Sequence, residues 1–345
     1  YLFNQIKRYR TKGIFTKTFL LVMCLVILLL IINGVNFYLQ MEDMVTQEVT
    51  NNINASLKRI KDVSDNILKS SESLATNTSL QDNVLFYTIA TKQQSGEYEK
   101  DITIFTKKYT LVQDYLDSIY VYSKGSGRVT TNRDSYNISE FADKNWMNHL
   151  DVTPEQNIGI FSRRKEDVYP YLITLVRPIT YGNVIKSEKE NDKVTGAILI
   201  NIDAKVLGSI LDTDGNPNME NLFIFNDKGI ILYNNDYEKI GIHASQVEEV
   251  RNFYDQQNGY TEQVNIHGVP SIVSVVTSQH YDIKYLSIMP TAYYQDMFAQ
   301  TVEYTMKNML FALLGAVVIT FAVTYKTYQP RSEERRVGKE CRSRW

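Results

Sequence analysis

The sequence predicts an α+β protein in which two transmembrane helices flank an external domain built from two similar lobes. Two stretches, residues 18–41 and residues 308–325, are mostly apolar and contain no charged side chain, which predicts the two membrane helices. A repeated pattern predicts the lobes. SIYVYSKGSGRVTTN and, about a hundred residues later, NLFIFNDKGIILYNN both read as a strand, a glycine-containing turn and a second strand.

The first apolar stretch, residues 18–41, is long enough to cross a bilayer, because a hydrocarbon core needs about 20 residues of helix. Five lysine and arginine residues and no acidic residue precede it, which by the positive-inside rule places residues 1–17 in the cytoplasm. A cleavable signal peptide is the alternative, but its apolar region is about 7–15 residues long and ends at small residues. We therefore expect residues 18–41 to stay as an anchor.

The second transmembrane helix is expected at residues 304–326. Eighteen uncharged residues lie between Lys307 and Lys326, and flanking tyrosines suit the membrane interface. A buried core helix is the alternative. Two spans predict a multi-pass protein of the cell membrane, with residues 42–303 outside and both termini in the cytoplasm. Membrane lipid is therefore an expected partner.

Charge and cysteine usage describe the external part. The net charge is −2, to which residues 1–17 contribute +5 and residues 331–345 contribute +3, leaving −10 on residues 18–330. Such an acidic exterior offers no basic face for nucleic acid. The two cysteines are Cys24 and Cys341, so the external domain has no disulfide, which suits a bacterial exterior.

Motifs for catalysis and metal binding are absent from the sequence. It has no Gly-x-Ser-x-Gly elbow, no His-Glu-x-x-His and no phosphate-binding glycine loop. Its four histidines show no short metal-ligand spacing. We therefore expect no enzyme activity, no metal and no cofactor.

The C-terminal tail differs from the rest of the chain. Residues 331–345, RSEERRVGKECRSRW, resemble the translation of a sequencing adapter. We expect the chain to be a fragment whose native sequence ends near Pro330, with residues 327–330 opening a cytoplasmic output region. A natural basic segment attracted to anionic lipid is the alternative.

A long helix is expected to continue outward from the first span over residues 42–84, because its apolar residues recur at spacings of three and four. This stripe packs either on the domain that follows or on the same helix of a second copy, so a homodimer is one expected assembly. A further helical stretch is predicted over residues 79–116, with a break near residues 93–96.

Strand patterns begin at Asp117. We name residues 85–212 the distal lobe and residues 213–303 the proximal lobe. After its strand–turn–strand unit, the distal lobe has two more strand candidates, YPYLITLVRPI and VTGAILINI. The proximal lobe has three more, YTEQVNI, PSIVSVVTS and IKYLSIMP.

A long helix leaving the membrane, followed by two strand-rich lobes, resembles the double Cache domain of bacterial membrane receptors. The resemblance covers residues 40–300 and rests on the order and length of the elements and on the strings SIYVYS, GAILINID, LFIFNDKGIILY and IKYLSIMP. It implies two PAS-like α/β lobes, with a small molecule held in the membrane-distal lobe.

The resemblance also implies a position for the ligand. In amino-acid-binding members of that family, an Arg-x-Trp-Tyr string holds the ligand carboxylate and a later Asp holds the amine. The matching residues here are the string Lys144-Asn145-Trp146-Met147 and Asn201. Lysine offers a point charge instead of a bidentate fork, and asparagine lacks the negative charge that an amine needs. These departures favour a sugar or other small solute over an amino acid.

Aromatic and polar side chains of the distal lobe complete the predicted site, because aromatic faces with a few polar groups suit a small solute. The alternative is that the aromatic residues are ordinary core residues. A neighbouring charge run, residues 163–165, is expected in a solvated loop. The predicted ligand-binding residues are Trp146, Lys144, Tyr120, Tyr122, Tyr169, Tyr171, Asn201 and Asp203.

The sequence thus favours the sensory portion of a bacterial signalling receptor, in which solute binding shifts the second span. Residues 325–330 resemble the junction before a HAMP-type helix. This implies a cytoplasmic output that is either a two-component sensor histidine kinase or a membrane-bound AraC-type transcription regulator, and Tyr328 favours the regulator. Nucleic acid would be a partner only through that output. A structural two-span protein, such as a polysaccharide chain-length regulator, is the alternative.

Overall fold

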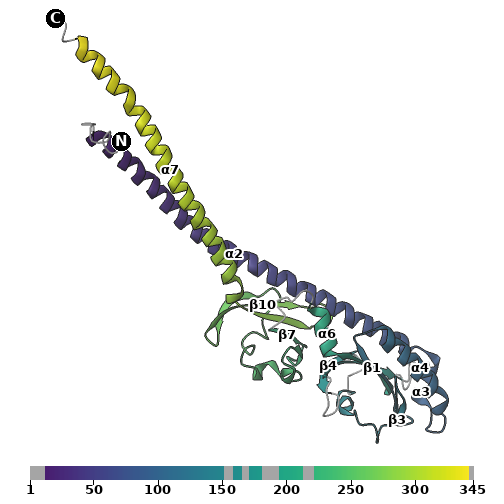
Figure 1. Cartoon of the computed structure of the whole chain (residues 1–345). Helices are drawn as coiled ribbons and strands as arrows, with labels where there is room; N and C mark the ends of the chain where they lie inside the picture. The colour runs from purple at the N-terminus through teal and green to yellow at the C-terminus, as the bar shows by residue number, and fades with distance from the viewer. Residues whose placement is uncertain (1–11, 151–157, 165–170, 181–193, 213–220, 342–345) are drawn as a thin grey trace. The chain divides into compact units, whose positions relative to one another are not determined.

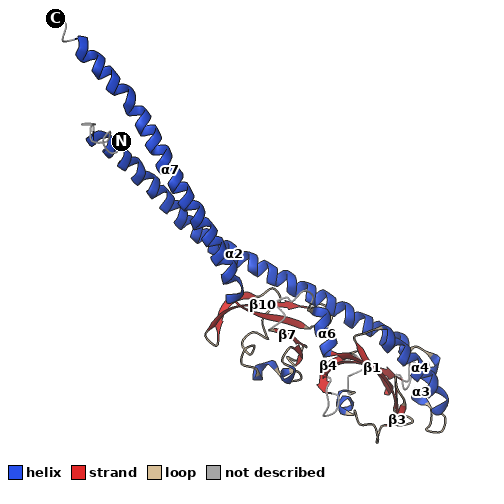
Figure 2. Cartoon of the chain, in the orientation of Figure 1, coloured by secondary structure: helices blue, strands red, loops and turns tan. Residues whose placement is uncertain are grey.

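The computed structural model describes residues 12–150, 158–164, 171–180, 194–212 and 221–341. The chain divides into two compact units. One unit consists of Tyr1–Val49 together with Ala292–Trp345, and its described part is helical. The other unit, Thr50–Thr291, contains both β-sheets (Figures 1 and 2).

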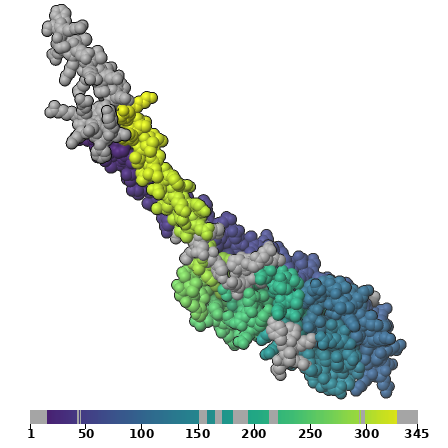
Figure 3. All heavy atoms as spheres, in the orientation of Figure 1, coloured from purple at the N-terminus to yellow at the C-terminus, as the bar shows by residue number. Residues whose placement is uncertain are grey.

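The helical unit contains the first part of α2 (Lys12–Ser79) and α7 (Ala292–Cys341), which lie side by side (Figures 1 and 3). The rings of Tyr38 and Phe298 meet edge to face at 5.7 Å. Both helices are long and apolar enough to cross a membrane, with windows of mean hydropathy 2.9 and 1.9. This confirms the prediction of two apolar candidate spans.

The part of α2 in the second unit packs on the lobes of its own chain. Its apolar stripe is buried there, including Ile53, Leu57, Ile60, Leu68 and Ala75. The opposite side of the helix is exposed and polar, as at Lys58 and Asp62. Of the two packing alternatives for this stripe, the structure therefore shows the intramolecular one.

The distal lobe begins with two helices that pack on its sheet, α3 (Asp82–Ile89) and α4 (Gly96–Val112). Residues 90–95 separate them, at the predicted helix break. The antiparallel sheet has the order β3-β2-β1-β6-β5-β4. Its strands are β1 (Leu116–Ser123), β2 (Arg128–Thr131), β3 (Ser135–Asn137), β4 (Gly159–Arg164), β5 (Tyr171–Thr180) and β6 (Val194–Asp203).

A short helix, α6 (Ala204–Leu211), follows β6 directly, and the proximal lobe comes after it. This lobe has an antiparallel sheet of order β8-β7-β11-β10-β9. Short 3₁₀ helices η3 (Tyr237–Lys239) and η4 (Ala244–Gln246) follow β8. The strands are β7 (Leu222–Phe225), β8 (Ile231–Asn234), β9 (Thr261–Ile266), β10 (Val269–Thr277) and β11 (Lys284–Pro290).

The two strand–turn–strand units predicted from the sequence are the hairpins β1–β2 and β7–β8. Their turns use glycine where the backbone is left-handed, with φ of 64° at Gly127 and 72° at Gly229. The mixed helix and antiparallel-sheet architecture confirms the predicted α+β class. It also differs from the long helical hairpin expected of a chain-length regulator.

Candidate functional site

One face of the distal sheet brings polar side chains from neighbouring strands together. In β1, Ser118, Tyr120 and Tyr122 point to this face because alternate residues of a strand share a side. Asn201 of β6 is paired with Ser118 on one side and with Thr174 of β5 on the other. Side chains that lie far apart in the sequence are therefore adjacent here.

An ion pair between Asp143 and Arg163 lies at the centre of this face. Each of the two side chains is only 4% exposed. The Arg163 Nε donates to Thr174 Oγ1 at 2.9 Å, and its Nη2 donates to Asn201 Oδ1 at 3.0 Å. Asp143 Oδ2 accepts a hydrogen bond from the Tyr120 hydroxyl at 2.8 Å. Both buried charges are thus compensated, as burial requires.

The hydrogen bonds continue through Asn201 to β1. Its Oδ1 also accepts from Thr174 Oγ1 at 2.9 Å, and its Nδ2 donates to Ser118 Oγ at 3.0 Å. Because the members polarise and position one another, changing one of them changes the rest. We name this set the polar cluster; its members are Ser118, Tyr120, Asp143, Arg163, Thr174 and Asn201.

Aromatic rings cover the polar cluster. Trp146, on the 3₁₀ helix η1 (Asn145–His149), is fully buried, and its Nε1 donates to the Asp143 carbonyl at 2.7 Å. Tyr122 meets Trp146 edge to face at a centroid distance of 5.4 Å, and Phe141 meets Tyr120 in the same way at 5.3 Å. The rings shield the ion pair from water, so its electrostatic interactions are strong.

Burial keeps the tyrosines of this face protonated. Burial first, and then the negative charge of Asp143, raise the pKa of Tyr120 above its ordinary value. Burial also raises the pKa of Tyr122. At neutral pH the Tyr120 hydroxyl is therefore a donor to the Asp143 carboxylate.

The structure brings together four of the predicted ligand-binding residues. Trp146, Tyr120, Tyr122 and Asn201 all lie on this one face of the distal lobe, and all are buried. Tyr169 lies outside the described residues.

The other three predicted residues lie elsewhere. Lys144 is exposed, and its Nζ donates to the Ser139 carbonyl at 2.6 Å. Tyr171 stacks on Tyr237 of the proximal lobe at 6.0 Å. Asp203 is the N-cap of α6, where its Oδ1 accepts from two backbone N–H groups at 2.8 and 3.2 Å. Capping is a structural role that a carboxylate at a helix start commonly has.

The prediction that residues 163–165 lie in a solvated loop is wrong for Arg163. This residue is in β4 and buried, because its side chain points to the same face as Phe161 and forms an ion pair with Asp143 there. Arg164, the next residue, ends the strand and lies over the ring of Tyr171 at 5.8 Å. Residue 165 is outside the described part of the chain. Alternate residues of a strand point to the same face, so a strand over GIFSRR places Arg163 on the same face as the apolar Phe161. This pattern was the signal that could have predicted a buried position for Arg163.

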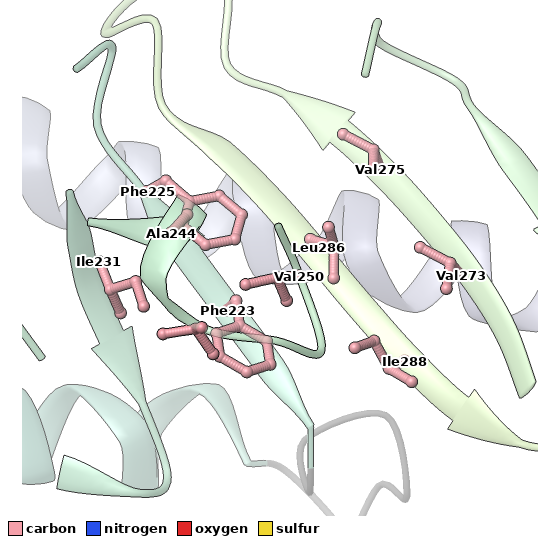
Figure 4. Packing of buried hydrophobic residues seen from close by; sticks show 10 residues of the cluster. Phe223, Phe225, Ile231, Ala244, Val250, Val273, Val275, Leu286 and Ile288 are labelled. Carbon is pink, nitrogen blue, oxygen red and sulfur yellow. The ribbon is translucent and has the colours of Figure 1, made fainter. Parts of the chain in front are cut away.

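Among its described residues, the proximal lobe has no buried ion pair, since the side chains of its ion pairs are at least a quarter exposed. Figure 4 shows a cluster of buried hydrophobic residues in its interior. They come from β7, β8, β10, β11 and the segment after η4 and include Phe223, Phe225, Ile231, Val250, Val273, Val275, Leu286 and Ile288. This cluster offers hydrocarbon contacts, while buried polar side chains such as Asn234 and Ser274 also lie in the lobe and form hydrogen bonds. The distal lobe is therefore the better candidate for binding a polar solute.

A cleft of about 1150 Å³ lies between the two lobes of the second unit. Its walls include residues 159–162 of β4, Lys228 of the proximal lobe and Glu72 of α2. His149 stacks on Phe161 at its edge, at a ring distance of 3.9 Å. Burial first, then the charges of Lys228 and Arg163, lower the pKa of His149 and favour its neutral form. Within the described ranges, no three His, Cys, Asp or Glu side chains gather as a metal site.

Comparison with known proteins identifies the fold. The sensory domain of the Campylobacter jejuni chemoreceptor Tlp3, solved with isoleucine bound, matches 73% of this chain and 96% of its own, with 12% identity and a TM-score of 0.50. The extracellular domain of a protein described as a histidine kinase matches 76% of this chain and 99% of its own, with 13% identity and a TM-score of 0.53. No protein-family model matches the sequence, and no curated protein matches it.

The unit Thr50–Thr291 therefore has the fold of the extracellular ligand-binding domains of bacterial chemoreceptors and histidine kinases, the Cache-type sensor domains. This confirms the double Cache fold that the sequence resemblance implied. Two helices with the length and composition of membrane spans flank the domain in the sequence. Within this fold, the polar cluster around Asp143 and Arg163 is the candidate site of the distal lobe.

Proposed function

We propose that this chain is the sensory portion of a bacterial transmembrane receptor, which binds a small polar solute in the distal lobe and passes a helix shift to the cytoplasm through α7. The observation that carries this proposal is the polar cluster, a buried and hydrogen-bonded set of side chains in one lobe of a fold that occurs in sensor domains. The proximal lobe, whose described residues form a hydrophobic cluster and no buried ion pair, supports the same assignment.

The chemistry of the polar cluster favours a small zwitterion, with α-amino acids as the first candidates. Arg163 supplies the bidentate fork that Lys144 lacks, and Asp143 supplies the negative charge that Asn201 lacks. A zwitterion can bind between the two charged side chains and replace their contact with each other. Its carboxylate would then pair with Arg163 and its amine with Asp143, so that no charge is left unpaired. This revises the sequence-based preference for a sugar, which would interact chiefly with the aromatic rings.

Transmission would use the short connection between the proximal lobe and α7. β11 ends at Pro290 and α7 begins at Ala292, so a single residue separates the sheet from the helix. A ligand shifts such an equilibrium by its differential affinity for two states, with coupling of about 1–3 kcal/mol, and helix shifts of about 1–2 Å between packed neighbours are sufficient. The output would be a histidine kinase or an AraC-type regulator.

A thermal-shift screen tests the proposed ligand class. The full chain is placed in lipid nanodiscs, with Trp345→Phe so that Trp146 is the only indole, and unfolding is followed by fluorescence with α-amino acids and with mono- and disaccharides. A true ligand at 100 times its Kd adds about 2.7 kcal/mol of stability. For a domain of this size this corresponds to about 5–10 °C.

Two variants locate the site. Thr174→Val removes the hydroxyl that bonds both Arg163 and Asn201, and we expect it to weaken binding at least tenfold. Lys144→Gln changes an exposed side chain bonded to Ser139, and we expect no change. If no solute of either class stabilises the chain, or if both variants weaken binding equally, the proposal fails.

A further inference from the structure

Strand β4 contacts both lobes through successive side chains. Phe161 and Arg163 point to the face of the distal sheet that carries the polar cluster. Ser162, between them, points the other way, and its Oγ donates to the Ile231 carbonyl of the proximal lobe at 2.8 Å. Because neighbouring residues of a strand are about 3.3 Å apart, the Arg163 and Ser162 backbones cannot move independently.

The acceptor of this hydrogen bond is well ordered by its own lobe. Ile231 is fully buried in the proximal core, and its N–H donates to the Ile242 carbonyl at 2.9 Å. Its carbonyl also accepts from the Gly241 N–H at 2.8 Å. A force on the Ile231 carbonyl therefore acts on β8 and on the segment that follows it, and not on a free loop.

One side of β4 borders the cleft between the lobes. Residues 159–162 line this cleft of about 1150 Å³, and within them Ser162 makes the hydrogen bond to Ile231. The two lobes also meet where the ring of Tyr171 stacks on the ring of Tyr237. Away from the cleft, Ile173 and Ile202 of the distal sheet lie beside Ile224 and Leu232 of the proximal sheet, so a displacement of β4 is not confined to one lobe.

We propose that β4 is the coupling strand of this sensor, and that the Ser162–Ile231 hydrogen bond transmits the state of the polar cluster to the proximal lobe. The inference rests on the proposed function, since it gives the route by which occupancy of the distal lobe is felt beyond it. When the carboxylate of a solute replaces Asp143 as the partner of Arg163, Arg163 moves, and Ser162 moves with it. Ser162 is a positioning residue in this scheme and does not touch the solute.

Hydrogen exchange measured by mass spectrometry tests the route without any ligand, on the full chain in nanodiscs. Tyr120→Phe removes one hydrogen bond to Asp143 and perturbs the cluster mildly. We expect Tyr120→Phe to raise the exchange rate of the β8 amides about twofold when Ser162 is present. In a Ser162→Ala background, the same substitution should leave the exchange rate of these amides unchanged. Ser162→Ala alone should raise β8 exchange about fivefold, the equilibrium factor of one net hydrogen bond.

Two controls separate coupling from general loosening. Ser162→Thr keeps the hydroxyl, and the sensitivity of β8 to Tyr120→Phe should persist. Ser271→Ala removes a buried serine that bonds the Val269 carbonyl at 3.2 Å within the proximal lobe, and the sensitivity should also persist. Asp143→Asn repeats the test with a larger perturbation.

Two results would overturn the coupling route. One is a β8 response that is equal with and without the Ser162 hydroxyl. The other is faster exchange in β4 that never reaches β8. Because no solute is added, a failed ligand screen leaves this result intact, and a failed exchange test leaves solute binding in the distal lobe untouched.

Discussion

Removing one partner of the Asp143–Arg163 pair should destabilise the distal lobe strongly. Arg163→Met keeps an unbranched side chain but leaves the Asp143 carboxylate in a site where it is 4% exposed, with the Tyr120 hydroxyl as its side-chain donor. It also removes the donors to Thr174 and Asn201. Breaking a buried ion pair from one side costs about 3–5 kcal/mol, because the remaining charge is desolvated and uncompensated.

The expected loss is measurable by thermal unfolding of the full chain. A domain of this size loses about 2–4 °C in Tm per kcal/mol, so Arg163→Met should lower Tm by about 6–20 °C. Trp146 is a suitable fluorescent reporter, since its Nε1 donates to the Asp143 carbonyl and it lies within the affected lobe. The Trp345→Phe background removes the second indole.

Two comparisons show whether the loss comes from the unpaired charge. Asp143→Leu combined with Arg163→Met leaves no buried charge, and the double variant should be clearly more stable than Arg163→Met alone. Glu249→Gln breaks a pair with Lys239 whose side chains are 34% and 26% exposed, and it should cost only about 0.2–1 kcal/mol. If Arg163→Met costs no more than Glu249→Gln, or if the double variant is as unstable as the single one, the charge argument is refuted.

Three further predictions concern other parts of the chain. Leu57→Ala should cost about 2–5 kcal/mol in urea unfolding because Leu57 is fully buried on α2, whereas Lys58→Ala, on the exposed side, should be near neutral. Burial raises the pKa of Tyr87 from 10.0 to about 12, so the folded state keeps its proton longer than the unfolded chain. Stability should be intact below pH 10 and fall by about 2–3 kcal/mol as pH rises through 12, and Tyr87→Phe should reduce this fall. In a cysteine-free background, an impermeant maleimide added outside should label Lys307→Cys and not Lys326→Cys; equal labelling would contradict the topology.

Periodicity and turn chemistry were sufficient to predict most of the fold. Residues 18–41 and 308–325 were recognisable as candidate spans because length and lack of charge are properties of the sequence itself. The stripe of α2 was also visible, but its partner was not. Whether Leu57 meets its own lobe or a second copy depends on tertiary packing, which helical spacing does not encode.

The site was only partly predictable, for a reason that Arg163 illustrates. Three adjacent basic residues are usually solvated, and nothing in the local sequence shows that Asp143, twenty positions earlier, reaches the same face of the sheet. Asp203 shows the opposite case. It directly precedes the helical run AKVLGSIL, and an aspartate in that position is a common N-cap. The sequence alone could therefore have predicted the capping role that the structure shows, as an alternative to the predicted binding role.

The unequal interiors of the two lobes have a consequence for how such a protein can diversify. The recognition groups of the distal lobe are a handful of side chains from separate segments, and exchanging them need not disturb the hydrocarbon packing of the proximal lobe. New chemical preferences can therefore arise in one half while the half joined to α7 at Thr291 keeps its shape. Evolution, or an engineer, could change what is detected and retain the machinery that reports it.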